Sequence, residues 1–329
     1  MPLVETEKQM EAYKDFVRNS QYGKAMQDPN WSKIKANWTN DYVYVEKNGH
    51  IAGAMSVIGI KNDNGKHFLY APRGPVCDFK DYDLVEELIK EAEVLVDKYD
   101  AFLLRMDPEV DFNEKIIYEY EKRGYDFRTY GLDNHAFTQP RYNMILEIAS
   151  NDEDTLFENF SSATRRNIRK SYRNEIETIR ETNEKTIDTF YELTKIMADR
   201  QGIGHRPKDY FQRLCDYMGG EIFTSYYNGE PLSSSLLVAY NDKVYYLYAA
   251  SSNEHRNKMP NFNMIWEEIK WSKENGYKYF DFGGVFSVDS KDGLYRFKEG
   301  FCYPDKYTAF IGELDVVYDR DKYNEFIKK

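Results

Sequence analysis

The first half of the chain alternates between runs with the period of a strand and runs with the period of a helix. A tight turn at Asn48-Gly49 leads into an apolar run, and a second β-rich run covers residues 67–71. Between Asp83 and Tyr99 the apolar residues recur every three or four positions, which predicts an amphipathic helix. A short apolar segment then ends at Asp107 and predicts a buried strand.

The second half repeats this order of elements. Its turn lies at Asn228-Gly229, its β-rich run at residues 244–249, its helix at 263–275 and its last strand before Asp281. Three pairs of landmarks are separated by 180, 178 and 174 residues: Gly49 and Gly229, Tyr70 and Tyr248, Asp107 and Asp281. The nearly constant separation indicates duplication of one α/β unit. The alternative is chance, because α/β proteins often reuse this order.

The predicted fold class is α/β (α+β), with two tandem domains that each contain a mixed, twisted sheet flanked by helices. We place the first domain at residues 1–145 and the second at residues 146–309, with the junction just after residues 139–144. The C-terminal tail, residues 310–329, is expected to complete the first domain. A hairpin followed by strand–helix–strand resembles the N-acyltransferase architecture of GNAT acetyltransferases.

Composition restricts the class of protein. The 329 residues are 41% hydrophobic and 16% aromatic, which is enough for large cores and excludes wholesale disorder. Mean hydropathy is −0.76, and no apolar run approaches the ~18 residues of a membrane span. The charged start shows no secretory signal, and the three distant cysteines suit a reducing compartment. We therefore expect a cytoplasmic protein without stable membrane insertion.

A net charge of −11 disfavours a nucleic-acid partner unless the chain carries a local basic patch. One run provides five cations within nine residues: Arg165, Arg166, Arg169, Lys170 and Arg173. On a helix, the arginines at 165, 169 and 173 align on one face and could meet the phosphates of a tRNA. The alternative is a solvated face that pairs with nearby acids, namely Glu175, Glu177 and Glu181.

Several common chemistries have no motif here. The chain lacks a G-x-S-x-G elbow, H-E-x-x-H, a Walker loop and G-x-G-x-x-G, and its five histidines are isolated. We therefore expect neither a metal nor a cofactor. The turns at 72–76 and 252–260 also lack the paired glycines that cradle the pyrophosphate of acyl-CoA, and their prolines remove donors. An acyl donor would thus not be a CoA thioester.

Seven short motifs, in order, resemble the Fem family of aminoacyl-tRNA-dependent peptidoglycan-bridge transferases, specifically its short FemX-type members. They are Gln27-Asp28-Pro29-Asn30-Trp31-Ser32-Lys33-Ile34-Lys35, Leu104-Arg105-Met106-Asp107-Pro108-Glu109, Gln139-Pro140-Arg141-Tyr142-Asn143-Met144, His205-Arg206-Pro207-Lys208-Asp209-Tyr210, Tyr248-Ala249-Ala250-Ser251, Asp281-Phe282-Gly283-Gly284 and Leu294-Tyr295-Arg296-Phe297-Lys298. Between Arg173 and His205 only about one helix fits, so the charged arm of longer members is absent.

The resemblance implies two GNAT-like domains and transfer of glycine, alanine or serine from aminoacyl-tRNA. The implied acceptor is the side-chain amine of the third stem residue in UDP-MurNAc-pentapeptide or a lipid-linked precursor. It also implies that Arg206 and Tyr210 contact the nucleotide-linked substrate, that Lys35 binds the same phosphates and that Tyr248 lines the substrate channel. A guanidinium can fork onto a pyrophosphate. From the sequence alone, Lys35 could equally be a surface lysine on the first helix, and Tyr248 a core residue.

Three residues are our candidates for catalysis: Lys298, its neighbour Phe297, and Asp107. A fixed cation can stabilise the oxyanion formed when an amine attacks an ester, and the resemblance assigns Lys298 to the aminoacyl end. The alternative is a surface ion pair with Asp281 or Glu299. Asp107 could orient the attacking amine or take its proton, or it could merely cap the next segment.

Two other functions stay open from the sequence. One is an acyltransferase of the same fold with another acceptor, such as a protein N-terminus, or with acetyl-CoA as donor. The other is a non-catalytic protein that binds nucleotide sugars or tRNA. The sequence does not distinguish lysine from diaminopimelate at the third stem position.

Overall fold

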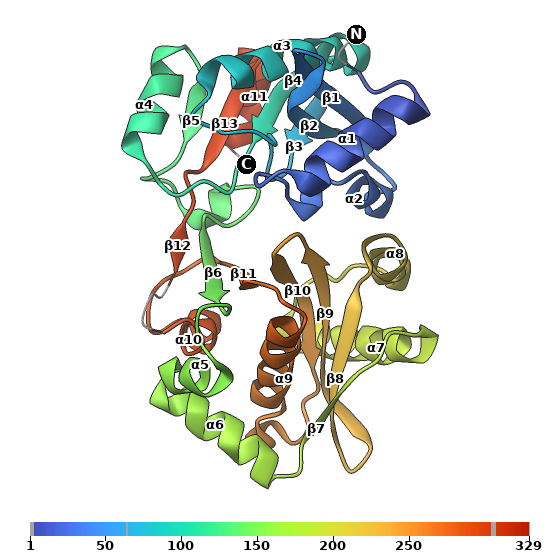
Figure 1. The fold of residues 1–329 in the computed structure, drawn as a ribbon, viewed down its shortest axis with the longest axis vertical. Helices are drawn as coiled ribbons and strands as arrows, with labels where there is room; N and C mark the ends of the chain where they lie inside the picture. Colours follow the sequence, from blue (N-terminus) through green and yellow to red (C-terminus); the bar gives the residue numbers. More distant parts are fainter. Residues whose placement is uncertain (1–2, 64, 304–306, 329) are drawn as a thin grey trace. The chain divides into compact units, whose positions relative to one another are not determined.

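The computed structural model describes residues 3–63, 65–303 and 307–328 and divides into two units (Figure 1). Unit 1 comprises Met1–Arg141 and Ala309–Lys329, and unit 2 comprises Tyr142–Thr308. The boundary falls four residues before the expected position 145. The reason is that strand β6, Tyr142–Glu147, pairs with β11 of unit 2 from its first residue onward.

Unit 1 is built around a six-stranded sheet in the order β1-β2-β3-β4-β13-β5. Only β3 and β4 pair in parallel; the other pairs are antiparallel. Its elements are α1 (Glu7–Asn19), η1 (Ala25–Gln27), α2 (Pro29–Ile34), β1 (Thr39–Lys47), β2 (His50–Lys61), β3 (His67–Ala71), α3 (Tyr82–Tyr99), β4 (Ala101–Met106), α4 (Glu114–Lys122), β5 (Asp126–Arg128), η2 (Asn134–Ala136), β13 (Glu313–Val317) and α11 (Arg320–Ile327).

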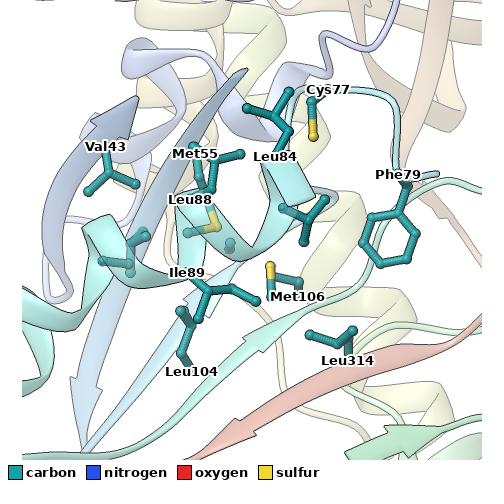
Figure 2. Packing of buried hydrophobic residues seen from close by; sticks show 14 of the residues in the cluster. Val43, Met55, Cys77, Phe79, Leu84, Leu88, Ile89, Leu104, Met106 and Leu314 are labelled. Carbon is teal, nitrogen blue, oxygen red and sulfur yellow. The ribbon is translucent and has the colours of Figure 1, made fainter. Parts of the chain in front are cut away.

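Helix α3 covers the core of unit 1, as its periodicity predicts. Asp81 caps the helix by accepting from Leu84 N, and Leu84, Leu88 and Leu95 are buried. Figure 2 shows Leu88 and its neighbours facing side chains from the strands, with Leu314 of β13 in the same cluster. The C-terminal tail is thus part of this core.

Unit 2 holds a seven-stranded sheet in the order β12-β6-β11-β10-β9-β8-β7. Its β8–β9 hairpin turns through Asn228 and Gly229, which both have positive φ, as a tight hairpin turn requires. The elements are β6 (Tyr142–Glu147), α5 (Glu153–Asn159), α6 (Ser162–Arg173), β7 (Glu177–Arg180), α7 (Glu184–Gln201), α8 (Lys208–Met218), β8 (Glu221–Tyr227), β9 (Glu230–Tyr240), β10 (Lys243–Ser251), η3 (Arg256–Lys258), α9 (Pro260–Glu274), β11 (Tyr279–Val285), α10 (Gly293–Glu299) and β12 (Thr308–Ala309).

Two features are absent from the residues that the structure describes. None of the helices combines the length and the apolar character that crossing a membrane requires. Within the same residues, no three His, Cys, Asp or Glu side chains are grouped so as to hold a metal ion.

Candidate functional site

The two units differ where their parallel strands end. In unit 1, β3 and β4 stay paired up to Ala71 and Met106. In unit 2, the pairing of β10 with β11 runs from Lys243 to Tyr245 on β10 and stops at Asp281 on β11. Each strand also carries a bulge just beyond that point, between Tyr246 and Tyr248 in β10 and after Asp281 in β11. Strands β10 and β11 therefore separate beyond these residues. Their backbone N–H and C=O groups there do not pair with each other and can bind other groups.

Lys298 places its amine at this opening. Its Nζ donates a hydrogen bond of 2.9 Å to the carbonyl of Gly284 on β11, and the residue is only 7% exposed. Burial lowers the pKa of Lys298 to about 8, although the charge of Asp281 opposes that shift. The alternative of a surface ion pair is therefore wrong. The ammonium form of Lys298 is therefore a buried cation that the Gly284 carbonyl orients.

Phe297 lies beside a pocket in the same unit. Its ring packs on Phe262 with centroids 5.0 Å apart, and it lines a pocket of about 660 Å³. The pocket is also bounded by the loop after β10, the start of α9 and Leu294 of α10. An apolar wall with polar loop atoms on the other side is typical of a site for a small organic group.

The loop after β10 is held by Arg200, a residue that the sequence analysis missed. Arg200 Nη1 donates to the carbonyls of Ser251 and Ser252 at 3.0 and 3.1 Å, and Nη2 donates to Ser251 Oγ at 3.2 Å. Burial and the nearby Arg256 lower the pKa of Arg200. No local signal could have found this residue, because its partners lie far along the chain from the end of α7.

The turn that leads into α9 cannot form a glycine-rich cradle. Met259 has a positive φ, and Pro260 at the first helical position lacks an N–H. Residues 251–260 contain no glycine. The first turn of α9 therefore lacks the donor arrangement that holds a CoA pyrophosphate.

Arg206, Tyr210 and Tyr248 come together in unit 2. The Arg206 guanidinium lies over the Tyr210 ring, 5.5 Å from its centroid, and Tyr248 Oη donates to Tyr210 Oη at 3.0 Å. Arg206 lies in an exposed loop before α8, whereas Tyr210 is buried in the first turn of that helix. Burial raises the pKa of the Tyr210 phenol, so this hydroxyl stays protonated and can offer a hydrogen bond.

Lys35 belongs to unit 1 and follows the second helix, not the first. It is the C-cap residue of α2 and is half-buried, with Nζ 5.9 Å from the centroid of the Trp38 ring. The alternative of a fully solvated surface lysine on the first helix is therefore wrong.

Asp107 lies at the end of β4 in unit 1 and is almost completely buried. Its Oδ1 accepts from Arg73 N at 2.7 Å, and its Oδ2 accepts from Tyr70 Oη at 2.8 Å and from Gln139 Nε2 at 3.0 Å. Burial raises the pKa of Asp107 to about 6, against the lowering effect of Arg73. The carboxylate connects the loop after β3 to the segment before β6, which differs from the alternative of a cap on the next segment.

The basic run forms helix α6, but its cations are not equivalent. Arg165 Nη1 donates to the carbonyls of Glu158 and Phe160, and Arg169 pairs with the Glu158 carboxylate at 3.1 Å. Both arginines thus bind the end of α5. The pairing acid is Glu158, not Glu175, Glu177 or Glu181.

Three other cations of α6 have a different environment. The side chains of Arg166, Lys170 and Arg173 make no hydrogen bond or ion pair with any residue that the structure describes. Their spacing of four and three residues places them on one face of the helix. The side chains without a described ion pair therefore lie on the face 166–170–173, whereas the sequence analysis aligned Arg165, Arg169 and Arg173.

Comparison with known proteins identifies the family. The FemAB family profile matches residues 9–225, and the profile of the acetyltransferase (GNAT) domain matches residues 159–299. A UDP-N-acetylmuramoylpentapeptide-lysine N(6)-alanyltransferase of Weissella viridescens is 34% identical over 327 residues, which cover 97% of this chain and 96% of that one. The chain belongs to the FemAB family.

One more distant relative and two solved structures are also similar to this chain. A lipid II:glycine glycyltransferase of Staphylococcus haemolyticus (strain JCSC1435) is 26% identical, over 94% of this chain and 91% of the relative. The crystal structure of FemX has a TM-score of 0.86 at 22% identity and covers 99% of this chain and 100% of that one. A tandem GNAT protein from the clavulanic acid biosynthesis pathway has a TM-score of 0.55 at 8% identity, covering 96% and 97%. The fold of this FemAB-family protein is thus α/β with GNAT-like units, as predicted.

Proposed function

We propose that this FemAB-family protein is an aminoacyltransferase that builds peptidoglycan bridges. It moves an amino acid from aminoacyl-tRNA to the side-chain amine of the third stem residue of UDP-MurNAc-pentapeptide. The observation that carries the proposal is the Weissella viridescens alanyltransferase, which matches over nearly the full length of both chains. That relative is more similar than the lipid II glycyltransferase, so we favour the UDP-linked acceptor and test alanine first.

The chemistry is aminolysis of an ester. The neutral acceptor amine attacks the ester carbonyl, a C–N bond forms, and the ester C–O bond to the tRNA ribose breaks. The proton lost by the amine ends on the ribose oxygen that leaves. We assign stabilisation of the intermediate oxyanion to the Lys298 ammonium, because it is a buried cation at the open ends of β10 and β11. Phe297 would shield the reacting ester from water.

We keep Asp107 as the candidate that orients the attacking amine. With its pKa raised to about 6 by burial, its carboxylate is mainly ionised at neutral pH and can accept a hydrogen bond. Both oxygens already accept from protein donors, and this supports orientation more than removal of a proton. The ester is activated, so the reaction does not need a strong protein base.

We assign Arg206, Tyr210, Tyr248 and Lys35 to the acceptor. Arg206 is an exposed guanidinium that the Tyr210 ring holds from one side, so it can still fork onto a phosphate. Tyr248 and Tyr210 share a hydrogen bond and can donate to the same ligand. Lys35 is proposed as a second phosphate contact and is tested by its own variant.

We assign the pocket beside Phe297 and three cations of α6 to the aminoacyl-tRNA. The pocket of about 660 Å³ could hold the aminoacyl end, and Arg166, Lys170 and Arg173 could meet tRNA phosphates. Both proposed substrates are molecules of the cytoplasm, and we place the reaction there. Ester aminolysis requires no metal or cofactor.

A direct assay tests the proposal. The protein is incubated with tRNA charged with alanine, glycine or serine, and with UDP-MurNAc-pentapeptides that carry lysine or diaminopimelate at the third position. Mass spectrometry should show addition of one amino acid to one of these acceptors. An acceptor acetylated on the third side chain and uncharged tRNA are the controls. Absence of product from every pair, or product formed only with acetyl-CoA, would contradict the proposal.

A further inference from the structure

A series of contacts in unit 2 connects a buried carboxylate to the Lys298 amine. Asp281 Oδ1 accepts a hydrogen bond of 2.8 Å from Gly283 N, two residues further along β11. The carbonyl of the next residue, Gly284, accepts the 2.9 Å hydrogen bond from Lys298 Nζ. Two hydrogen bonds and the backbone of residues 283–284 therefore connect the Asp281 carboxylate to the Lys298 amine.

This turn interrupts the pairing of β11 with its neighbouring strands. Pairing with β10 ends at Asp281, and pairing with β6 shifts register after Asp281 and resumes at Gly284, opposite Asn143. Gly283 has a φ of +74°, a conformation that other residues rarely adopt. A Cβ at Gly283 would lie 4.0 Å from Lys298 Nζ, so the turn is next to the amine. The Asp281 carboxylate supplies a hydrogen bond where the strand ladder does not.

The carboxylate is itself held in place. Lys243, at the start of β10, lies with its Nζ 3.4 Å from Asp281 Oδ2, and the two side chains are 10% and 5% exposed. The charge of Asp281 also favours the ammonium form of Lys298 and opposes the fall in pKa that burial causes. Cys302 is the other titratable group that acts on the amine in this way.

We propose that Asp281 is a positioning residue of the transfer reaction. It fixes the Gly283–Gly284 turn, so that the Gly284 carbonyl holds the Lys298 amine where β10 and β11 part. Lys243 orients Asp281 from the neighbouring strand. The kinetic consequences rest on the proposed function, whereas the link between Asp281 and Lys298 does not.

Two substitutions at Asp281 distinguish its hydrogen bond to the turn from the effect of its negative charge. Asp281→Ala removes the acceptor for Gly283 N. We expect kcat to fall about 10- to 100-fold, as it does when a catalytic group is misplaced. The KM values for both substrates should stay within about two-fold of wild type. Asp281→Asn keeps an oxygen acceptor and should retain most of kcat. Because it removes the negative charge, it should shift the alkaline limb of the pH–rate profile to lower pH. Equal kcat values in Asp281→Ala and wild type would overturn the proposal.

A second variant and a matched control distinguish loss of positioning from a general effect on folding. Gly283→Ala perturbs the turn without touching Asp281, and it should lower kcat in the same way as Asp281→Ala. Asp78→Ala removes a turn of the same kind in unit 1, where Asp78 Oδ1 accepts from Lys80 N at 2.9 Å, and should leave kcat unchanged. A loss of kcat in Asp78→Ala as large as in Asp281→Ala would show a general effect of such turns and would overturn the assignment.

A readout without turnover separates this inference from the proposed function. The pKa of Lys298 can be followed by NMR of protein with ¹³C-labelled lysine, with the resonance assigned through Lys298→Met. Asp281→Asn should lower this pKa, and Asp281→Ala should also change the resonance position of the Lys298 side chain at constant pH. If wild type transfers no amino acid, the proposed function fails and the titration alone decides the link. An unchanged Lys298 titration in both variants would overturn it.

Discussion

At the scale of single residues, burial determines what the amine of Lys298 can do. A lysine in water has a pKa more than two units higher than the value of about 8 here, and the difference comes mainly from removing the ammonium from water. The hydrogen bond to Gly284 O and the charge of Asp281 keep the cation in place. A cation that is already desolvated and oriented stabilises a developing oxyanion without reorganisation.

We expect Lys298→Met to lower kcat about 100-fold or more, as removal of an oxyanion donor does. As pH rises, deprotonation of the acceptor amine should increase the wild-type rate. Deprotonation of Lys298 should decrease it as pH rises through about 8. The profile should therefore bend near pH 8, and Lys298→Met should lack this bend. Single-turnover measurements across pH provide the check. A normal rate in Lys298→Met would remove the lysine from the reaction.

Arg206→Ala should weaken binding of UDP-MurNAc-pentapeptide by ~1.5–3 kcal/mol, the scale of a charged hydrogen-bonded contact. Affinity for aminoacyl-tRNA should hardly change. Lys208→Ala is the matched control, because this cation lies two residues further along and pairs with Asp188. Calorimetry that shows equal muropeptide affinity in Arg206→Ala and wild type would exclude the phosphate contact. Lys35→Ala, measured in the same way, tests the second phosphate contact separately.

At the scale of elements, the cations of helix α6 have two different environments, because only some of them pack against α5. Arg165 and Arg169 bind carbonyls and a carboxylate at the end of α5, and Arg169 also stacks on Phe157 with its guanidinium 5.0 Å from the ring centroid. These contacts hold two helices together. The remaining cations, Arg166, Lys170 and Arg173, form the face that is free to meet a polyanion.

Replacement of Arg166, Lys170 and Arg173 by Gln should raise the KM for aminoacyl-tRNA. If three phosphates are met, the wild-type slope of log affinity against log salt should be on the order of −2 to −3 and should become flatter in the triple variant. Muropeptide affinity should not change, and the helix should stay folded because Gln forms helix nearly as well as Arg.

The matched control is Arg165→Gln with Arg169→Gln, which removes two cations of the same helix that are bound to α5. This pair should lower thermal stability and leave the salt slope nearly intact. If the control flattened the slope as much as the triple variant did, the two arginines would also contact tRNA and the division of roles would be wrong.

At the scale of the whole molecule, the sequence predicted what is encoded locally. The order of strands and helices in both halves follows from hydrophobic periods and turn residues. The place of the tail in unit 1 depends instead on the pairing of β13 with β4 and β5, which lie far along the chain. The boundary at 145 was four residues late, because the partner of β6 is β11, far along the chain. Asp107 was found by its place at a strand end, but its partners Tyr70, Arg73 and Gln139 come from two other segments. Arg200 was missed for the same reason.

The return of the C-terminal tail leads to a prediction about stability. Strand β13 lies between β4 and β5, and Asp315 binds the buried Arg105 through two hydrogen bonds of 2.6 and 2.7 Å. Deleting residues 309–329 leaves β5 without its strand partner and Arg105 without Asp315. An uncompensated buried charge alone costs about 3–5 kcal/mol, a large part of the stability of a domain. Unit 1 of the shortened chain should therefore fail to fold.

Unit 2 is continuous from Tyr142 to Thr308 and keeps all but the last residue of its strands in the shortened chain. Calorimetry should therefore show one remaining cooperative transition, and limited proteolysis should digest residues 1–141 and spare residues 142–308. A chain that lacks only residues 328–329 is the control and should melt like wild type, because α11 ends at Ile327. If the chain without residues 309–329 melted with the full enthalpy of wild type, β13 would be dispensable for unit 1. The Arg105–Asp315 contact would then contribute little to its stability.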